Sequence, residues 1–179
     1  MKQSFKEDYY RMTGTEYSFG IKSCINIIFS HQIRYVRCLR KAQEKPTEWR
    51  KLRLKRFSRK YGLEISPSAS IGRGLYLGHP YNITVAGGAK IGDNVNLHKG
   101  CTIGAENRGK REGCPTVGNC VAVGINATVI GNIKIGNDVM IAPNSFVNFD
   151  VPDHSVVIGN PGVIHRKENA TEGYIAFRV

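Results

Sequence analysis

One histidine in the sequence lies in a setting suited to acid–base chemistry. His79 stands two positions after the aliphatic Leu77. This part of the chain is built of six-residue units, described below, and the unit that follows His79 lacks the glycine or other small residue found in the neighbouring units. Glu64 lies 15 residues earlier. A carboxylate hydrogen-bonded to an imidazole would fix the ring's tautomer and raise its basicity. The pair predicts a general base, His79, that is oriented by Glu64; the alternative is a surface histidine and an ordinary solvated glutamate.

The other histidines favour structural roles. His98 follows the aliphatic Leu97 and is a second candidate base. A structural or surface role is the preferred interpretation of His98. His154 and His165 lie in the region that ends the regular pattern and are interpreted as structural, and His31 as a surface residue of a helix. A catalytic zinc site needs three gathered ligands, and these spacings do not supply them. No metal is expected.

The five cysteines have no metal-ligand spacing and are odd in number, so free thiols in a cytoplasmic protein are expected. The first fifteen residues are mostly polar and do not resemble a signal peptide. The longest apolar run, residues 24–29, is too short to span a bilayer. Cys114 is a possible nucleophile, although a role in loop packing is preferred. The cysteines are Cys24, Cys38, Cys101, Cys114 and Cys120.

A six-residue period positions these side chains. Aliphatic residues recur at every sixth position from Val117 to Val147, and the same period runs upstream from Ile65 to Ile83 and, after a slip of two residues, from Ile91 to Ile103. A short fixed period is the signature of a solenoid, and six-residue units indicate a parallel β-helix in which the aliphatic residue points inward. The fold class expected is mainly β.

The N-terminal third differs from the rest in charge and period. Of the net charge of +12, residues 1–60 carry +11 and residues 61–179 carry +1. Apolar residues at steps of three and four predict helices over residues 17–43 and 48–60, the second capped by Thr47 and rich in Lys and Arg. Such basic helices pack within an oligomer or lie on an anionic membrane, so an acidic partner would meet this segment. There is no nucleic-acid recognition motif.

The chain is therefore divided into three parts. Residues 1–61 form a basic helical segment, residues 62–165 the β-helix, and residues 166–179 a C-terminal tail. An inserted loop, residues 104–116, interrupts the repeat, and such insertions often map to a binding face.

Three motifs resemble the hexapeptide-repeat acyltransferases, closest to the serine-acetyltransferase-like branch. They are Ile65-Ser-Pro-Ser-Ala-Ser-Ile-Gly-Arg-Gly-Leu-Tyr-Leu-Gly-His79, Cys114-Pro-Thr-Val-Gly118, and Val151-Pro-Asp-His-Ser155 with Gly159-Asn-Pro161. The resemblance covers roughly residues 62–165. It implies a left-handed parallel β-helix, a homotrimer and acetyl-CoA as donor. It also implies that His79 is the general base and that Glu64 stands where an aspartate usually supports it.

The chain departs from this branch at three positions. Serine acetyltransferases carry an acidic residue where Gly78 stands, and an Arg-His pair where Gly113 and Cys114 stand. A free amino acid brings two opposite charges that need partners once desolvated. The Cys-Pro ending of the loop is similar to O-acetyltransferases of exopolysaccharide clusters, of the colanic acid type. The function expected is acetyl transfer to a sugar hydroxyl in capsular, exopolysaccharide or lipopolysaccharide synthesis, in the cytoplasm or at the inner membrane face; the alternative is serine O-acetylation for cysteine synthesis.

The remaining site residues follow from this interpretation. Acetyl-CoA is expected in a groove between subunits, along stacked corners, with backbone N–H groups stabilising the oxyanion. The acceptor is expected at Asn82, Arg108 and Cys114. The residues expected to bind acetyl-CoA are Gly104, Ala105, Ile125, Pro143, Arg166 and Lys167.

Two interpretations from other classes remain open. One is a zinc enzyme on the same scaffold, the β-helix type of carbonic anhydrase, which would need a third gathered histidine beside His79 and His98. The other is a scaffold without catalytic activity that docks proteins or a membrane through its basic helices. Acetyl-CoA binding would separate the second from an enzyme.

Overall fold

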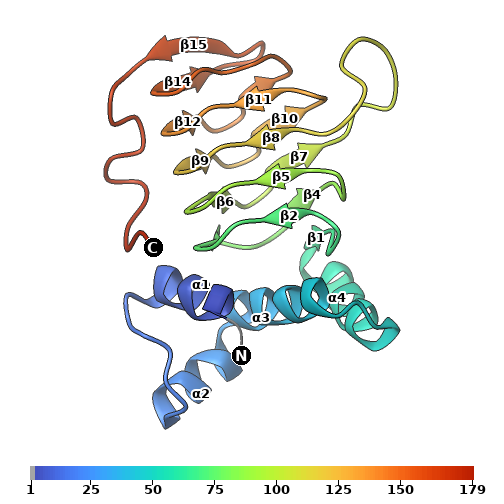
Figure 1. The fold of residues 1–179 in the computed structure, drawn as a ribbon, viewed down its shortest axis with the longest axis vertical. Coiled ribbons are helices and arrows are strands. Elements are labelled where there is room, and N and C mark those ends of the chain that lie inside the picture. The colour runs from blue at the N-terminus through green and yellow to red at the C-terminus, as the bar shows by residue number, and fades with distance from the viewer. Residues whose placement is uncertain (1–2) are drawn as a thin grey trace.

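The computed structural model describes residues 3–179; residues 1 and 2, at the start of the predicted helical segment, lie outside them. A stack of flat coils stands on a group of helices, and the C-terminal tail runs back along the stack toward α1 (Figure 1). The helices are α1 (Gln3–Thr13), α2 (Ile21–Phe29), α3 (His31–Glu44) and α4 (Glu48–Tyr61).

The helical segment differs from the prediction in two places. The single helix predicted over residues 17–43 is wrong, because the chain becomes extended at Ser30, whose hydroxyl caps α3 by accepting from the Ile33 N–H at 3.3 Å. Helix α1 was not predicted at all. Its few apolar residues include Phe5 and Tyr9, which are four positions apart and buried. The helix predicted over 48–60 is present as α4, without a side-chain cap from Thr47.

The coils form three parallel sheets, and successive strands pass from one sheet to the next. The prediction of a parallel β-helix behind an N-terminal helical segment is confirmed. The first sheet contains β1 (Glu64–Ile65), β4 (Thr84–Val85), β7 (Thr102–Gly104), β10 (Thr128–Ile130) and β13 (Phe146–Val147). The second contains β2 (Ser70–Ile71), β5 (Lys90–Ile91), β8 (Thr116–Val117) and β11 (Lys134–Ile135). The third contains β3 (Tyr76–Gly78), β6 (Asn96–His98), β9 (Val121–Val123), β12 (Val139–Ile141), β14 (Ser155–Ile158) and the antiparallel β15 (Val163–Arg166).

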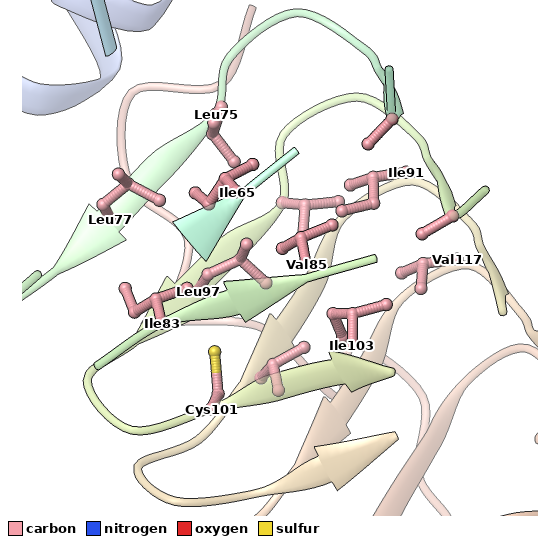
Figure 2. Close-up of a cluster of buried hydrophobic side chains, with 14 of the residues drawn as sticks. Ile65, Leu75, Leu77, Ile83, Val85, Ile91, Leu97, Cys101, Ile103 and Val117 are labelled. Atoms are coloured by element: carbon pink, nitrogen blue, oxygen red, sulfur yellow. The ribbon is translucent and has the colours of Figure 1, made fainter. Parts of the chain in front are cut away.

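The six-residue period marks the side chains that fill the solenoid (Figure 2). Leu77, Leu97, Ile103 and Val129 are fully buried, whereas Ile71, in the first coil, is only partly buried. Burying one such side chain contributes about 1.5–3 kcal/mol relative to leaving it exposed. Burial of this stack of aliphatic residues therefore stabilises the coils against one another.

The two extra residues of the first coil lie elsewhere than the period indicated. Ile65 pairs with Val85 and Leu77 pairs with Leu97. The interval that is two residues longer therefore runs from Leu77 to Val85, and its extra residues precede Ile83 rather than follow it. Because Ile83 is also fully buried, the pattern of apolar residues alone did not reveal the shift. The insertion enlarges the corner that contains His79.

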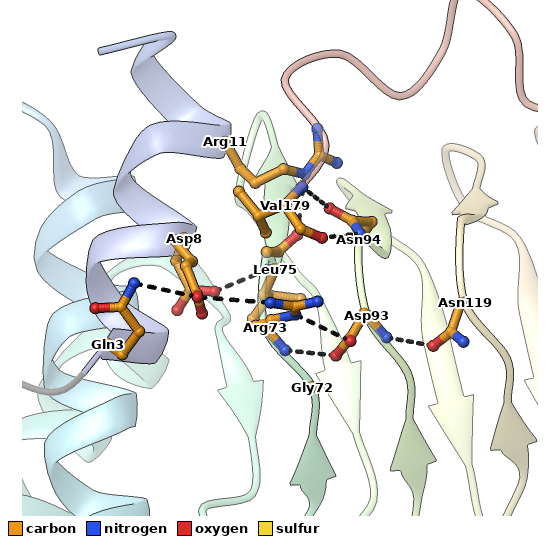
Figure 3. A network of polar contacts seen from close by, with 12 residues as sticks. Gln3, Asp8, Arg11, Gly72, Arg73, Leu75, Asp93, Asn94, Asn119 and Val179 are labelled. Atoms are coloured by element: carbon orange, nitrogen blue, oxygen red, sulfur yellow. Dashed lines mark hydrogen bonds and ion pairs between the residues drawn. The ribbon is translucent and has the colours of Figure 1, made fainter. Parts of the chain in front are cut away.

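One edge of the solenoid, between the second and third sheets, carries a ladder of side chains. On each coil a side-chain oxygen accepts the backbone N–H of the coil before it: Asp93 from Arg73 at 2.9 Å, Asn119 from Asp93 at 2.8 Å, and Asn137 from Asn119 at 2.8 Å. Figure 3 shows the start of this row, where Asp8 of α1 accepts from the Leu75 N–H. We call it the ladder edge.

The C-terminal tail runs beside the ladder edge (Figure 1). Val179 donates its N–H to Asn94 Oδ1 at 2.8 Å, and Asn94 Nδ2 donates to Val179 O at 2.7 Å (Figure 3). Further along, Thr171 Oγ1 donates to Asp138 Oδ1 at 2.7 Å. The tail is thus held at both ends against the coils.

Candidate active site

His79 occupies the enlarged corner between β3 and β4. Its backbone has φ +48°, a left-handed conformation that is uncommon for a residue with a side chain, and Asn82 in the same corner has φ +53°. The Tyr81 N–H donates to His79 O at 2.8 Å. The same conformation recurs at other corners, for example at Asn126 and Asn144, so it belongs to the turns of the solenoid and not to His79 alone. The His79 side chain is exposed, so its ring is accessible from solvent.

The corresponding corners of the following coils stack in register with this one. Gly100 donates its N–H to Tyr81 O at 2.9 Å, Asn126 to Lys99 O at 3.1 Å, and Asn144 to Ile125 O at 2.8 Å. We call this row, between the third and first sheets, the histidine edge. Ile125 and Pro143 lie on it, so the structure places two of the six residues expected to bind acetyl-CoA on the same edge as His79.

The other four expected acetyl-CoA residues lie on different edges. Gly104 ends β7 and Ala105 follows it, at the edge between the first and second sheets. Arg166 ends β15 and donates to Asp153 O at 2.8 Å, which places it with Lys167 at the ladder edge. One copy of the chain therefore does not gather all six residues.

His98 packs directly over the residue that precedes His79. The register pairs Gly78 with His98, and a Cβ added at Gly78 would lie 2.3 Å from His98 Nδ1. Burial, and then the proximity of His79, lower the pKa of His98. The ring of His98 thus fills the space where a side chain at position 78 would stand, and it favours the neutral form.

The helical segment supplies an aromatic wall next to the His79 corner, which the sequence did not reveal. His31 stacks on Tyr61 with ring centroids 4.5 Å apart, and Tyr81 lies 5.2 Å from His31. The interpretation of His31 as a surface residue is wrong, since it is partly buried and burial lowers its pKa. Gln32 also reaches this corner and donates to Leu77 O at 2.6 Å.

Glu64 does not form the expected hydrogen bond to His79. Strand β1 pairs Glu64 with Thr84, and the carboxylate Oε1 accepts from the Ser58 hydroxyl of α4 at 2.9 Å. Both Glu64 and His79 are exposed, so no packing locks either side chain in place.

The residues expected to contact the acceptor are also dispersed. Asn82 lies in the His79 corner, while Arg108 is exposed in the inserted loop. Cys114 closes that loop, and its Sγ lies 2.9 Å from a Cβ added at Gly88. This contact fits a packing role for Cys114. The loop itself is a short hairpin, bridged between Glu106 and Gly113.

Several further groups are defined by the structure. All five cysteines are free. His154 Nδ1 lies 2.9 Å from Asp138 Oδ2, and His165 is exposed in β15. Within residues 3–179 no group of three or more His, Cys, Asp or Glu side chains could hold a metal ion. Of the helices in that range, none has the length and apolar character needed to cross a bilayer.

Comparison with known proteins gives a consistent result. No family model matches the chain. A serine acetyltransferase of Staphylococcus aureus (strain Mu50 / ATCC 700699) is 40% identical over 114 residues, which are 63% of this chain and 53% of that protein. A serine acetyltransferase of Helicobacter pylori is 40% identical over 99 residues, covering 55% of this chain and 58% of that protein. The chain thus spans about half the length of the curated relatives it matches.

Solved structures extend the likeness to the helices. The crystal structure of Neisseria gonorrhoeae serine acetyltransferase matches with a TM-score of 0.74 and 26% identity over 92% of this chain and 64% of that one. The enzyme from Brucella abortus matches with a TM-score of 0.75 and 25% identity over 94% of this chain and 68% of that one.

These findings correct the expected acceptor. The interpretation of the chain as an exopolysaccharide-type enzyme acting on a sugar hydroxyl is wrong, because the relatives and the solved structures cited are serine acetyltransferases. The departures at Gly78, Gly113 and Cys114 do not outweigh the likeness of the rest of the chain. In sequence and in fold, the chain is similar to serine acetyltransferases.

Proposed function

We propose that this chain is an acetyl-CoA-dependent O-acetyltransferase whose acceptor is the hydroxyl of serine. The observation that carries the proposal is the combined likeness, in sequence and in fold, to serine acetyltransferases. An exposed histidine at the enlarged corner of the solenoid fits a residue that meets substrate.

The reaction requires one base, which first takes a proton from the acceptor and later gives a proton to the leaving group. His79 takes the proton of the serine hydroxyl while the oxygen attacks the carbonyl carbon of the thioester. The tetrahedral intermediate then collapses, the carbon–sulfur bond breaks, and the thiolate of CoA takes the proton back from the imidazolium. Backbone N–H groups at a neighbouring corner stabilise the oxyanion. We assign to Glu64 the role of orienting the His79 ring. Its carboxylate must first break the hydrogen bond with the Ser58 hydroxyl.

A homotrimer would explain the dispersed positions of the expected residues. The histidine edge carries His79, Ile125 and Pro143, while Gly104 and Ala105 lie on another edge and Arg166 and Lys167 on a third. When three triangular solenoids pack around a common axis, an edge of one chain faces the neighbouring chain. We therefore place acetyl-CoA in a groove between two subunits, where its contacts come from both.

Acceptor recognition must differ in detail from the pattern of the family. Gly78 offers no carboxylate, and the ring of His98 takes up its space. Gly113 and Cys114 offer no cation for the carboxylate of serine. A desolvated amino acid needs a partner for each of its charges. We therefore expect the partners of these charges elsewhere in the assembly. We expect the residues at 78, 113 and 114 to affect only the shape of the acceptor site.

The test is acetyl transfer by the purified chain, measured as CoA release from acetyl-CoA with L-serine as acceptor. His79→Ala is expected to lower kcat by about 10²–10⁴, the range of general base catalysis, because no group then removes the hydroxyl proton. His165→Ala, an exposed histidine in β15, is the matched control and should retain full activity. Circular dichroism and gel filtration report whether each variant keeps its fold and assembly.

Two results would contradict the proposal at different levels. Wild-type protein that binds acetyl-CoA in calorimetry but never acetylates serine would remove the acceptor. A fully active His79→Ala variant would leave the reaction in place and remove the base.

A further inference from the structure

A hollow between α3 and α4 is lined by cations and by no acidic residue. Its volume is about 480 Å³, and six of its lining side chains are basic. The two helices lie side by side beneath the first coil of the solenoid (Figure 1). The basic side chains are Arg34, Arg37 and Lys41 of α3, and Arg53, Arg56 and Lys60 of α4. We call this set the basic hollow.

The positive charges of the basic hollow lack counter-charges. None of the six side chains forms an ion pair within residues 3–179. The Nε atoms of Arg34 and Arg37 are buried and have no hydrogen-bond partner in that range. Buried polar groups are normally hydrogen-bonded, and buried charges are normally paired. Two orphaned guanidinium donors in one hollow therefore indicate that an acceptor belongs there.

The neighbouring side chains show the same excess of positive charge. Burial, and then the charge of Arg37, lower the pKa of Lys41. Burial raises the pKa of the Cys38 thiol, while the charges of Arg53 and Lys41 act in the opposite direction. An anion in the hollow would relieve the repulsion that Lys41 experiences. The remaining walls are apolar, since Ile27, Phe57 and Tyr61 complete them.

We propose that the basic hollow binds a phosphate-bearing anion. Guanidinium groups present several donors in a planar fork that matches the oxygens of phosphate, and ammonium groups add point charges. The apolar walls would take an uncharged part of the same ligand. Phosphate could come from a soluble phosphoester or diphosphate, or from the head group of an anionic lipid. The inference does not depend on acetyl transfer, because no basic side chain of the hollow belongs to the histidine edge; only Tyr61 lies in both the hollow and the aromatic wall beside His79.

The experiment compares two α4 double variants of the full chain that remove the same charge. Arg53→Gln/Arg56→Gln removes two cations of the hollow, whereas Lys55→Gln/Arg59→Gln removes two exposed cations outside it. Binding of inorganic pyrophosphate is measured by calorimetry at fixed ionic strength. We expect the hollow variant to weaken binding at least about tenfold, because a hydrogen bond to a charged group contributes about 1.5–3 kcal/mol. The control should change it less than about threefold.

A second arm identifies the source of the phosphate. Co-sedimentation with vesicles of phosphatidylcholine, with and without phosphatidylglycerol, is measured for the same variants. Pyrophosphate binding that is lost only in the hollow variant supports a soluble ligand. Binding only to phosphatidylglycerol vesicles, lost in the hollow variant and kept in the control, supports a lipid head group. Binding to neither probe, or an equal loss in both variants, would overturn the proposal and reduce the hollow to a solvated basic surface.

Discussion

The ladder edge and the histidine edge are built from the same coils but are finished in opposite ways. Along the ladder edge, Asp93, Asn119 and Asn137 each accept a backbone N–H of the preceding coil, and the tail is hydrogen-bonded to the neighbouring Asn94 and Asp138. Along the histidine edge the corners are joined by backbone hydrogen bonds, and His79, Asn82 and Pro143 remain exposed.

The difference shows how a repetitive scaffold separates stability from binding. An edge whose side-chain oxygens accept from its own backbone has fewer acceptors left for a ligand. An edge whose exposed side chains make no bond to the neighbouring coil keeps those groups available. The ladder edge also receives α1, while the histidine edge receives the aromatic wall of His31, Tyr61 and Tyr81. The three predictions below test this separation.

The largest effect is expected where α1 meets the ladder edge. Asp8 is fully buried and accepts from Arg40 Nε at 2.7 Å and Nη2 at 3.0 Å, and from the Leu75 N–H at 2.8 Å. Asp8→Ala leaves the buried Arg40 without its counter-ion, which costs about 3–5 kcal/mol. The free energy of unfolding, measured by urea denaturation, should fall by that amount.

The control for Asp8 is an ion pair in solvent. Glu48 pairs with Lys51 at 2.8 Å, but its side chain is 88% exposed. Glu48→Ala should change the free energy of unfolding by less than about 1 kcal/mol. If both variants lose the same stability, Asp8 does not join the helices to the solenoid in the way the contacts indicate.

A smaller effect is expected at the histidine edge. Gly78→Ala places a Cβ 2.3 Å from His98 Nδ1, so the ring of His98 must move, and overpacking of this kind costs about 1–3 kcal/mol. Gly104→Ala is the matched control in the same solenoid, because its Cβ would meet Ile130 at an ordinary 3.4 Å. Thermal unfolding measures both variants.

A double variant separates this clash from other causes. In Gly78→Ala/His98→Ala the obstructing ring is absent, so the two substitutions together should cost less than the sum of their separate costs, by about 1–2 kcal/mol. Strictly additive costs would show that His98 is not what excludes a side chain at position 78.

The sequence predicted the parts of the molecule that repeat. The period placed Leu97 and Val129 in the core because every coil solves the same packing problem locally. The atypical unit after His79 correctly marked the irregular corner. The Ser58–Glu64 bond, the stacking of His31 on Tyr61 and the docking of Val179 on Asn94 were not predictable. Each joins residues from different elements, and no periodic signal encodes such a contact.

The smallest expected effect lies at the far end of the ladder edge, where Asp138 holds the tail. Burial alone would raise the pKa of Asp138, but hydrogen bonds from Thr171, His154 and the backbone of Ala170 lower it to about 2. A carboxyl with a depressed pKa contributes stability above its ordinary pKa of 3.8, and this contribution is lost as the pH falls toward 2. The tail should therefore loosen in acid.

Hydrogen exchange detected by mass spectrometry, corrected for the intrinsic pH dependence, measures this loosening. Peptides that contain Ala170 and Thr171 should exchange about tenfold faster at pH 2 than at pH 4.5, because a hydrogen bond to a charged group contributes about 1.5 kcal/mol at the low end of its range. The hydrogen bond to Asp138 also raises the pKa of His154. The stability that the protonated His154 contributes is therefore lost as the pH rises through its raised pKa, not in acid. Asp138→Asn keeps an acceptor oxygen but cannot titrate, and its acid step should vanish. An unchanged acid step in that variant would show that the tail is released by another carboxyl, and that the ladder edge is closed without Asp138.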